Sequence, residues 1–131
     1  LYQNADFTSQ AFYFDVPQRP SEKQTLKVSG ILNLPKNLGT YPVIILFRGY
    51  VEPKDYKPGV GTARSAEVFA SNGFISLAPD FLGYGGSDKE SSDPFESRFE
   101  TYTTALTLLA SVETIPFADP FHIFLSFAKR L

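Results

Sequence analysis

The stretch Val43-Ile44-Ile45-Leu46-Phe47-Arg48-Gly49-Tyr50 decides the fold of this chain. Its first five residues are apolar and three of them are β-branched, which is typical of a strand buried on both faces of a parallel sheet. Pro42 precedes the run, where a strand tolerates proline, and Gly49 marks the turn that ends it. Because ligands bind at the carboxyl ends of strands in open α/β sheets, the loop that begins at Arg48 is the first place to look for chemistry.

Two segments with alternating apolar residues precede this strand. Residues 11–16 and residues 25–34 both show the period-two pattern of β-strands. A charged segment with two prolines, residues 17–24, connects them, so the two strands are predicted to pair antiparallel. Residues 1–10 are mixed and polar and are predicted to be a loose lead-in.

Two helix–strand units follow the Arg48 loop. A first helix is predicted between Thr62, which can act as its N-cap, and Gly73, which suits the position after a helix end. The apolar run at residues 74–78 predicts a second buried strand. That strand leads into a glycine-rich loop at residues 79–88.

The second helix has clear start signals. Asp93 can cap it, Pro94 fits its first position, and Glu96 stands three residues after the cap. The helix is predicted to continue to about Thr114 and to be followed by a strand at residues 122–127. Its predicted core-facing stripe consists of Phe99, Tyr102, Leu106, Leu109 and Ala110.

The predicted order of elements is therefore β-β-β-α-β-α-β. Strands that alternate with helices imply parallel right-handed crossovers, and the leading hairpin adds antiparallel strands. The fold class is α/β, with a mixed, mostly parallel sheet of about five strands and flanking helices. Residues 1–131 are predicted to form a single domain.

The composition excludes several classes of partner. The net charge of −2 gives no support for binding nucleic acid, and no apolar run approaches the roughly 20 residues of a membrane span. The chain has no cysteine and one histidine, His122, so we expect no thiolate or multi-histidine metal site. No cofactor is expected either, and the cellular compartment stays undetermined.

Two motifs together resemble the α/β-hydrolase fold: Arg48-Gly49-Tyr50, and the sequence APDFLGYGGSD at residues 78–88. Within that fold the chain looks most like the dipeptidyl aminopeptidase and acylaminoacyl peptidase group of serine hydrolases, relatives of the prolyl oligopeptidases. The resemblance covers roughly residues 25–119. It implies descent from a serine hydrolase that acts on peptide or ester bonds through an acyl-enzyme.

In that family the loop after the third strand supplies part of the oxyanion hole. The resemblance therefore assigns Gly49 and Tyr50 to this role, because a donor is needed where negative charge develops on the substrate carbonyl. Arg48 stands where many relatives carry histidine, and we assign it to substrate binding. The alternative is that Gly49 is only a turn and Tyr50 a packed aromatic residue.

The glycine-rich loop has two interpretations. Residues 83–88 could cradle a phosphate, as in a nucleotide-binding protein, but they lack the GxxxxGK[ST] pattern. We favour a structural loop over the active-site end of the sheet, in which the side chains of Asp80 and Ser87 bond backbone groups.

The catalytic residues of the family are missing from these 131 residues. A serine hydrolase of this fold carries its nucleophile in a GxSxG turn directly after the fifth strand, with the acid and the histidine later. No GxSxG occurs here, and the chain ends just after the predicted fifth strand. We therefore expect a truncated or frame-shifted N-terminal portion that is inactive alone.

Local substitutes for the nucleophile are weak. Ser126 and Lys129 match S-x-x-K, a pattern that needs a helix start and two further motifs. His122 is interpreted as a structural or surface group, and Glu96 and Glu100 as surface charges on a helix. The alternative function is a non-catalytic fragment or interaction module, which associates with itself or a partner through the apolar edge of its last strand.

Overall fold

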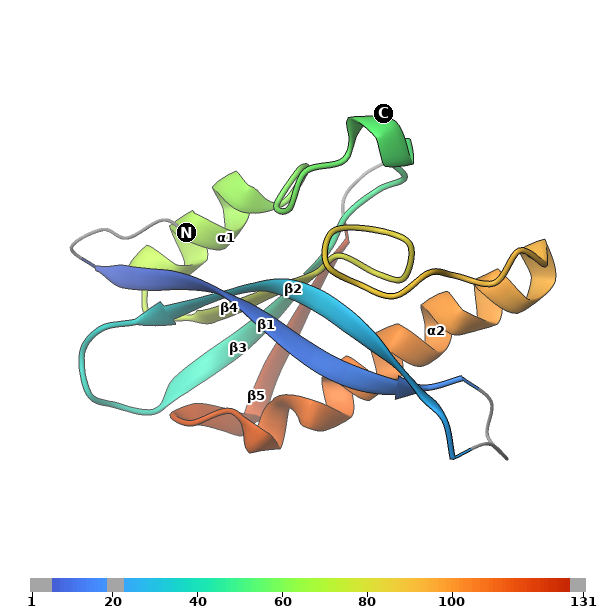
Figure 1. Cartoon of the computed structure of the whole chain (residues 1–131). Helices are drawn as coiled ribbons and strands as arrows, with labels where there is room; N and C mark the ends of the chain where they lie inside the picture. Colours follow the sequence, from blue (N-terminus) through green and yellow to red (C-terminus); the bar gives the residue numbers. More distant parts are fainter. Residues whose placement is uncertain (1–5, 19–22, 128–131) are drawn as a thin grey trace.

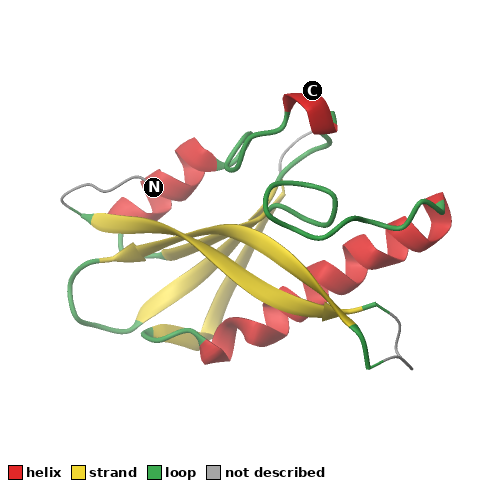
Figure 2. Cartoon of the chain, viewed as in Figure 1, coloured by secondary structure: helices red, strands yellow, loops and turns green. Residues whose placement is uncertain are grey.

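The computed structural model describes residues 6–18 and 23–127 and shows one mixed sheet with a helix packed on each face (Figure 1 and Figure 2). The strands lie in the order β1-β2-β4-β3-β5. The strands are β1 (Phe7–Pro17), β2 (Thr25–Pro35), β3 (Tyr41–Phe47), β4 (Ile75–Pro79) and β5 (Ala118–Phe127). The helices are α1 (Ala63–Ser71) and α2 (Pro94–Ser111), with short 3-10 turns at η1 (Pro53–Asp55) and η2 (Val112–Thr114).

The strand pairing confirms the predicted α/β sheet. β1 pairs antiparallel with β2, and β2 pairs antiparallel with β4. β3 lies between β4 and β5 and is parallel to both, so the VIILF run is the interior parallel strand that its composition predicts.

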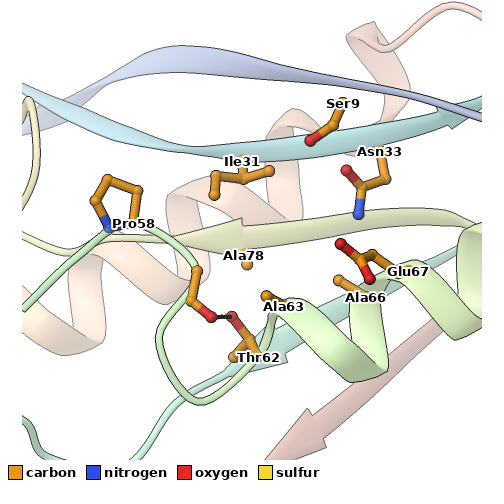
Figure 3. Close-up of a pocket in the computed structure, with 10 residues that line it drawn as sticks. Ser9, Ile31, Asn33, Pro58, Thr62, Ala63, Ala66, Glu67 and Ala78 are labelled. Atoms are coloured by element: carbon orange, nitrogen blue, oxygen red, sulfur yellow. Dashed lines mark hydrogen bonds between the residues drawn. The ribbon is translucent and has the colours of Figure 1, made fainter. Parts of the chain in front are cut away.

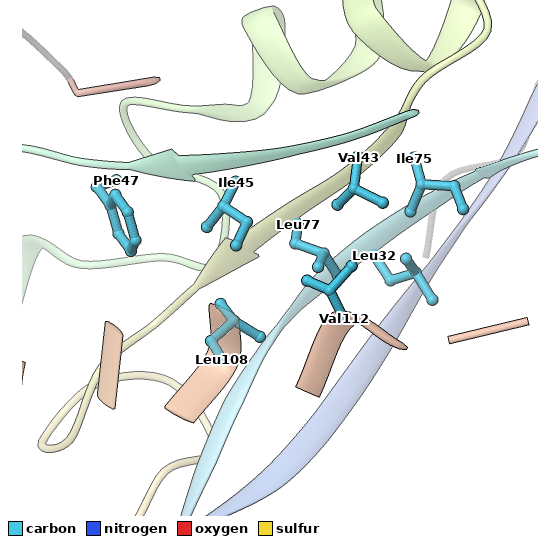
Figure 4. Packing of buried hydrophobic residues seen from close by; sticks show 8 residues of the cluster. All are labelled: Leu32, Val43, Ile45, Phe47, Ile75, Leu77, Leu108 and Val112. Atoms are coloured by element: carbon cyan, nitrogen blue, oxygen red, sulfur yellow. The ribbon is translucent and has the colours of Figure 1, made fainter. Parts of the chain in front are cut away.

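Alternate residues of β3 contribute to two hydrophobic clusters on opposite faces of the sheet. Val43, Ile45 and Phe47 point into the larger core, on the side that α2 covers (Figure 4). Ile44 and Leu46 point to the opposite face, where they pack with Ala66 of α1. A strand buried on both faces needs apolar side chains at every position, which explains its unbroken run.

Both outer strands begin earlier than the sequence predicts. The lead-in prediction is wrong from Phe7 onward, because Phe7 starts β1 and is fully buried; residues 1–5 lie outside the described residues. β5 begins at Ala118 rather than His122 and includes Pro120. Proline lacks a donor for a sheet ladder, but β5 is an edge strand with one neighbour, where that donor is not required.

The helix ends agree with their sequence signals. The Asp93 carboxylate accepts hydrogen bonds from the backbone N–H groups of Phe95 and Glu96, both at 2.9 Å. Gly73 follows α1 with a φ of +87°, the left-handed conformation that glycine adopts without strain. Thr62 is the N-cap of α1, although its hydroxyl makes no capping bond.

The predicted inner face of α2 is wrong except at Leu109, which packs against the larger core. Phe99, Tyr102 and Leu106 are exposed, and the buried residues of the helix are Glu100, Thr104 and Leu108. The aromatic residues contact one another instead, since the rings of Phe95 and Phe99 lie 5.0 Å apart. The inner face is the one that carries Leu108 into the larger core.

No helix in the described part of the chain is both long enough and apolar enough to span a lipid bilayer.

Candidate functional site

The candidate site is an open hollow at the carboxyl ends of β3 and β4, the place that open α/β sheets use for ligands. Its volume is about 560 Å³, and its walls come from the loop after β3, the loop after β4 and the first half of α2. All three residues predicted from the sequence, Arg48, Gly49 and Tyr50, line it. Opposite them lie Arg98 and Tyr102 of α2, which sequence reasoning missed because only the fold brings that helix here.

Gly49 and Tyr50 present an unoccupied stretch of backbone to this hollow. A side chain built on Gly49 would meet no atom within 4 Å, and the Tyr50 side chain is 69% exposed. Among the described residues, neither backbone N–H group has a hydrogen-bond acceptor. Exposed donors at a strand end can bind an anionic oxygen. Tyr50 is not the packed aromatic residue of the alternative interpretation.

Arg48 is held by aromatic rings and backbone oxygens. Its Cζ atom lies 4.7 Å from the ring centre of Tyr56 and 4.3 Å from that of Tyr84, and the two rings contact each other edge to face at 5.0 Å, so the guanidinium packs against both rings of this pair. One terminal nitrogen donates to the Asp80 carbonyl oxygen at 2.8 Å and the other to that of Gly49 at 3.3 Å. Arg48 therefore ties the loops after β3 and β4 together and shapes the wall of the hollow.

Asp80, at the start of the second loop, is buried and fully engaged. Its carboxylate accepts hydrogen bonds from the Ser29 hydroxyl, at 2.6 Å, and from the Tyr56 hydroxyl. The prediction that the Asp80 side chain bonds backbone groups is therefore wrong, because its hydrogen-bond donors are two side-chain hydroxyl groups. Burial, with the hydrogen bond to Asp80, raises the pKa of Tyr56 well above its usual value, so the phenol stays protonated.

The glycine-rich loop pairs with β2, as a structural loop would. Ser87 Oγ accepts from the Ser29 backbone N–H at 2.9 Å, which confirms the prediction for Ser87. Asp88 Oδ2 accepts from the Lys27 backbone N–H at 2.7 Å. Gly85 has a φ of +57°, and a Cβ there would lie 2.5 Å from Asp80 Oδ2. The close approach to the Asp80 carboxylate therefore requires glycine.

The remaining sequence candidates lie away from the hollow. His122 is exposed on β5, and its Nδ1 lies 2.6 Å from Asp119 Oδ2, an interaction that lowers the pKa of Asp119. Ser126 lies within β5, which is not the helix start that S-x-x-K requires, and Lys129 is outside the described residues. Glu100 is buried rather than a surface charge, and it accepts a hydrogen bond from the Ser91 backbone N–H.

The described residues contain no group of three or more histidine, cysteine, aspartate or glutamate side chains that could hold a metal ion.

The aromatic pair beside Arg48 was not predictable from the sequence, since Tyr56 and Tyr84 stand at irregular distances along the chain. Only the Gly-Tyr-Gly setting of Tyr84 marks it as part of a defined loop.

The chain was compared with protein families, curated sequences and solved structures. No family model and no curated protein sequence matches the chain. Solved structures do match. Acetyl xylan esterase 1 from Thermoanaerobacterium sp. superposes with a TM-score of 0.68 at 17% identity, over 96% of this chain and 42% of that one.

Two further solved structures agree. The α/β hydrolase GrgF from Penicillium sp. matches with a TM-score of 0.62 at 23% identity, over 92% of this chain and 37% of that one. The esterase Est1E from Butyrivibrio proteoclasticus, solved with ferulic acid, matches with a TM-score of 0.59 at 21% identity, over 78% and 39%.

The fold is a partial α/β-hydrolase fold. At these identities the likeness establishes the fold alone, and the predicted α/β-hydrolase fold is confirmed. The chain spans between about a third and a half of the length of the solved structures that it matches.

Proposed function

We propose that this chain supplies the oxyanion-hole loop of a serine hydrolase that cleaves peptide or ester bonds through an acyl-enzyme. The observation that carries the proposal is the pair of backbone N–H groups at Gly49 and Tyr50, which have no acceptor among the described residues and border the 560 Å³ hollow. When a nucleophile attacks an acyl carbonyl, the carbonyl oxygen gains negative charge. Donors already in place stabilise that charge without reorganisation.

The rest of the site fits this role. Arg48 lines the same hollow, and in this proposal it contributes to substrate binding by fixing the wall on which the acyl group lies. Its terminal nitrogens are engaged by the Asp80 and Gly49 carbonyl oxygens, so it acts on the shape of the wall. The esterases among the structural neighbours support an ester substrate, and the sequence motifs support the dipeptidyl aminopeptidase and acylaminoacyl peptidase group.

The nucleophile is the first point to test. A serine-directed fluorophosphonate probe is expected to leave the 131-residue chain unlabelled, because no GxSxG turn is present. Covalent labelling that one serine replacement abolishes would contradict the proposal. The nucleotide sequence after the Leu131 codon, translated in all three frames, is expected to contain a Gly-x-Ser-x-Gly run.

The oxyanion donor can be identified in a longer protein that carries this chain together with a segment that supplies the nucleophile, the acid and the histidine. If the backbone N–H of Tyr50 is the donor, Tyr50→Phe keeps kcat close to wild type; if the phenol is the donor, kcat falls roughly 10²–10³-fold. Tyr13→Phe, at an exposed tyrosine on β1, is the matched control. A loop without this role would leave kcat unchanged when Gly49 is replaced by proline, which removes a donor.

A second function is supported by a separate observation. β5 is an edge strand whose large apolar side chains are exposed, including Phe121 at 90% and Phe127 at 70%. An exposed apolar edge can pair with another chain. We therefore also propose that the chain acts as a non-catalytic interaction module that associates through β5. The hydrolase function requires a further segment that carries the catalytic residues, whereas the interaction module does not.

A further inference from the structure

A second cavity lies on the face of the sheet that α1 covers, away from the candidate oxyanion loop. It is a partly open pocket of about 190 Å³ between α1 and the neighbouring strands β1, β2 and β4 (Figure 3). That volume is equivalent to roughly six waters at ~30 Å³ each. The cavity has room for a small organic group.

The strand register decides which side chains line it. Ser9 of β1 lies directly opposite Asn33 of β2, and Ile31 of β2 lies directly opposite Ala78 of β4. Opposed residues on neighbouring strands project to the same face. The floor of the cavity is therefore apolar at Ile31 and Ala78 and polar at Ser9 and Asn33.

Asn33 has an unmet hydrogen-bonding requirement in this cavity. The residue is 3% exposed, and its Oδ1 atom has no hydrogen-bond partner among the described residues. A buried amide oxygen without a donor is costly, because it has lost water and gained nothing in exchange. A donor from outside the chain, either water or a ligand, can complete such an atom where it borders a cavity.

Glu67 brings a negative charge to the same end of the cavity. It lies on α1 one turn after Ala63, lines the cavity, and in Figure 3 its carboxylate is drawn at the Asn33 end. It is half-buried, and no hydrogen bond or ion pair joins it to any other described residue. Ala63 and Ala66 add apolar walls on the helix side.

We propose that this cavity binds a primary ammonium group attached to a short alkyl chain. An ammonium offers three donors and no acceptor. The acceptors at this end are the Glu67 carboxylate, Asn33 Oδ1 and Ser9 Oγ, and the Asn33 amide nitrogen, which Figure 3 draws on the Glu67 side, adds a donor among them. The charge-assisted bond to Glu67 supplies most of the selectivity. The alkyl chain lies on Ile31 and Ala78, which exclude water from it. The inference is independent of the proposed hydrolase function.

The test is a calorimetric titration of the 131-residue chain with n-butylammonium chloride at constant ionic strength. Saturable binding at one site is expected, with 1-butanol and sodium butyrate each binding at least ten-fold more weakly. Glu67→Gln keeps the shape of the side chain and removes its charge, and it should weaken n-butylammonium binding by about ten-fold or more. Glu113→Gln, at an exposed glutamate of η2, is the matched control and should bind like wild type.

A steric variant tests the location. Ala63→Leu fills part of the cavity without changing any charge, and it should abolish binding while far-ultraviolet circular dichroism remains that of wild type. The proposal is overturned if n-butylammonium does not bind, which would mean that water alone fills the cavity. It is also overturned if 1-butanol binds equally well, if Glu67→Gln binds like Glu113→Gln, or if Ala63→Leu still binds.

Discussion

Tyr56 takes part in two interactions at once. Its ring lies against the Arg48 guanidinium, and its hydroxyl donates to the buried carboxylate of Asp80. The negative charge of Asp80 and the burial of the phenol both oppose ionisation of Tyr56, and this raises its pKa. The loops after β3 and β4 therefore depend on a neutral tyrosine.

This arrangement predicts a specific loss of stability at alkaline pH. In the unfolded chain a tyrosine ionises near pH 10, whereas Tyr56 in the folded chain ionises at a higher pH. The contribution of this group is thus fully present below about pH 10 and is lost as pH rises toward the folded pKa. Tyr56→Phe should lower the free energy of unfolding by about 1–2 kcal/mol at pH 7, since it removes a hydrogen bond to a buried carboxylate.

Urea unfolding at pH 7 and pH 11 checks the prediction. The difference between wild type and Tyr56→Phe should shrink by up to about 1 kcal/mol at pH 11, with allowance for solvent screening of this half-exposed group. Tyr102→Phe, at an exposed tyrosine, should show no such change. An unchanged difference at the two pH values would contradict the mechanism.

At the scale of elements, α2 carries apolar side chains on two opposite faces. The outer face has Phe95, Phe99, Tyr102 and Leu106, and the inner face has Leu108 together with Glu100 and Thr104. Apolar periodicity identifies the side of a helix that faces the core only when one face is apolar. Here the stronger stripe is the exposed one, so sequence periodicity selected the wrong face.

The polar residues on the inner face of α2 lead to a prediction for Thr104. Its side chain is fully buried, and its hydroxyl has no partner among the described residues. Thr104→Val keeps the shape and removes the unsatisfied hydroxyl, so it should raise the free energy of unfolding by about 0.5–1.5 kcal/mol. Urea unfolding at pH 7 measures the change.

Thr101 provides the matched control for this substitution. It lies one turn earlier on α2, is exposed, and donates its hydroxyl to the Ser97 carbonyl oxygen at 3.2 Å. Thr101→Val should change the stability by less than about 0.5 kcal/mol, as surface substitutions usually do. If Thr104→Val is destabilising, the orientation of α2 described above is wrong.

The other elements show what sequence can and cannot determine. Strand β3 was predictable because an unbroken apolar run has one interpretation in an α/β chain, and α2 began where Asp93 and Pro94 indicate. β1 was predicted too short because Phe7 is separated from the alternating segment by polar residues. Asn33 was predicted on the face opposite the apolar residues of its strand and Ser9 in the lead-in, and it is the docking of α1 on that face that makes both of them line a pocket.

The candidate site was predictable where it depends on local sequence signals, and not where it depends on tertiary contacts. Arg48, Gly49 and Tyr50 follow directly from the end of β3, because the end of a buried strand is a local signal. The contacts of Arg48 with Tyr56 and Tyr84 are tertiary, and so is the approach of α2 to the hollow. No spacing rule along the chain indicates these contacts, since each depends on how two loops and a helix meet.

At the scale of the whole molecule, the sheet is asymmetric. One edge is β1, which pairs along its full length with β2. The other edge is β5, which has β3 on one side and no strand among the described residues on the other. Phe121 and Leu125 both lie on β5 and both are exposed; Phe121 belongs to the irregular segment between Ala118 and Ile123, and Leu125 pairs with Ile45 of β3.

We expect the 131-residue chain to self-associate through β5. Lysine on an edge strand opposes pairing, because it places charge where a second chain would dock. The double substitution Phe121→Lys with Leu125→Lys should therefore shift the chain toward monomer in sedimentation velocity across a concentration series. The matched control is Leu38→Lys with Val68→Lys, which adds the same charge at comparably exposed apolar residues away from β5. A wild-type chain that stays monomeric at every concentration, or a β5 variant that associates as much as the control, would show that this edge is not an interface.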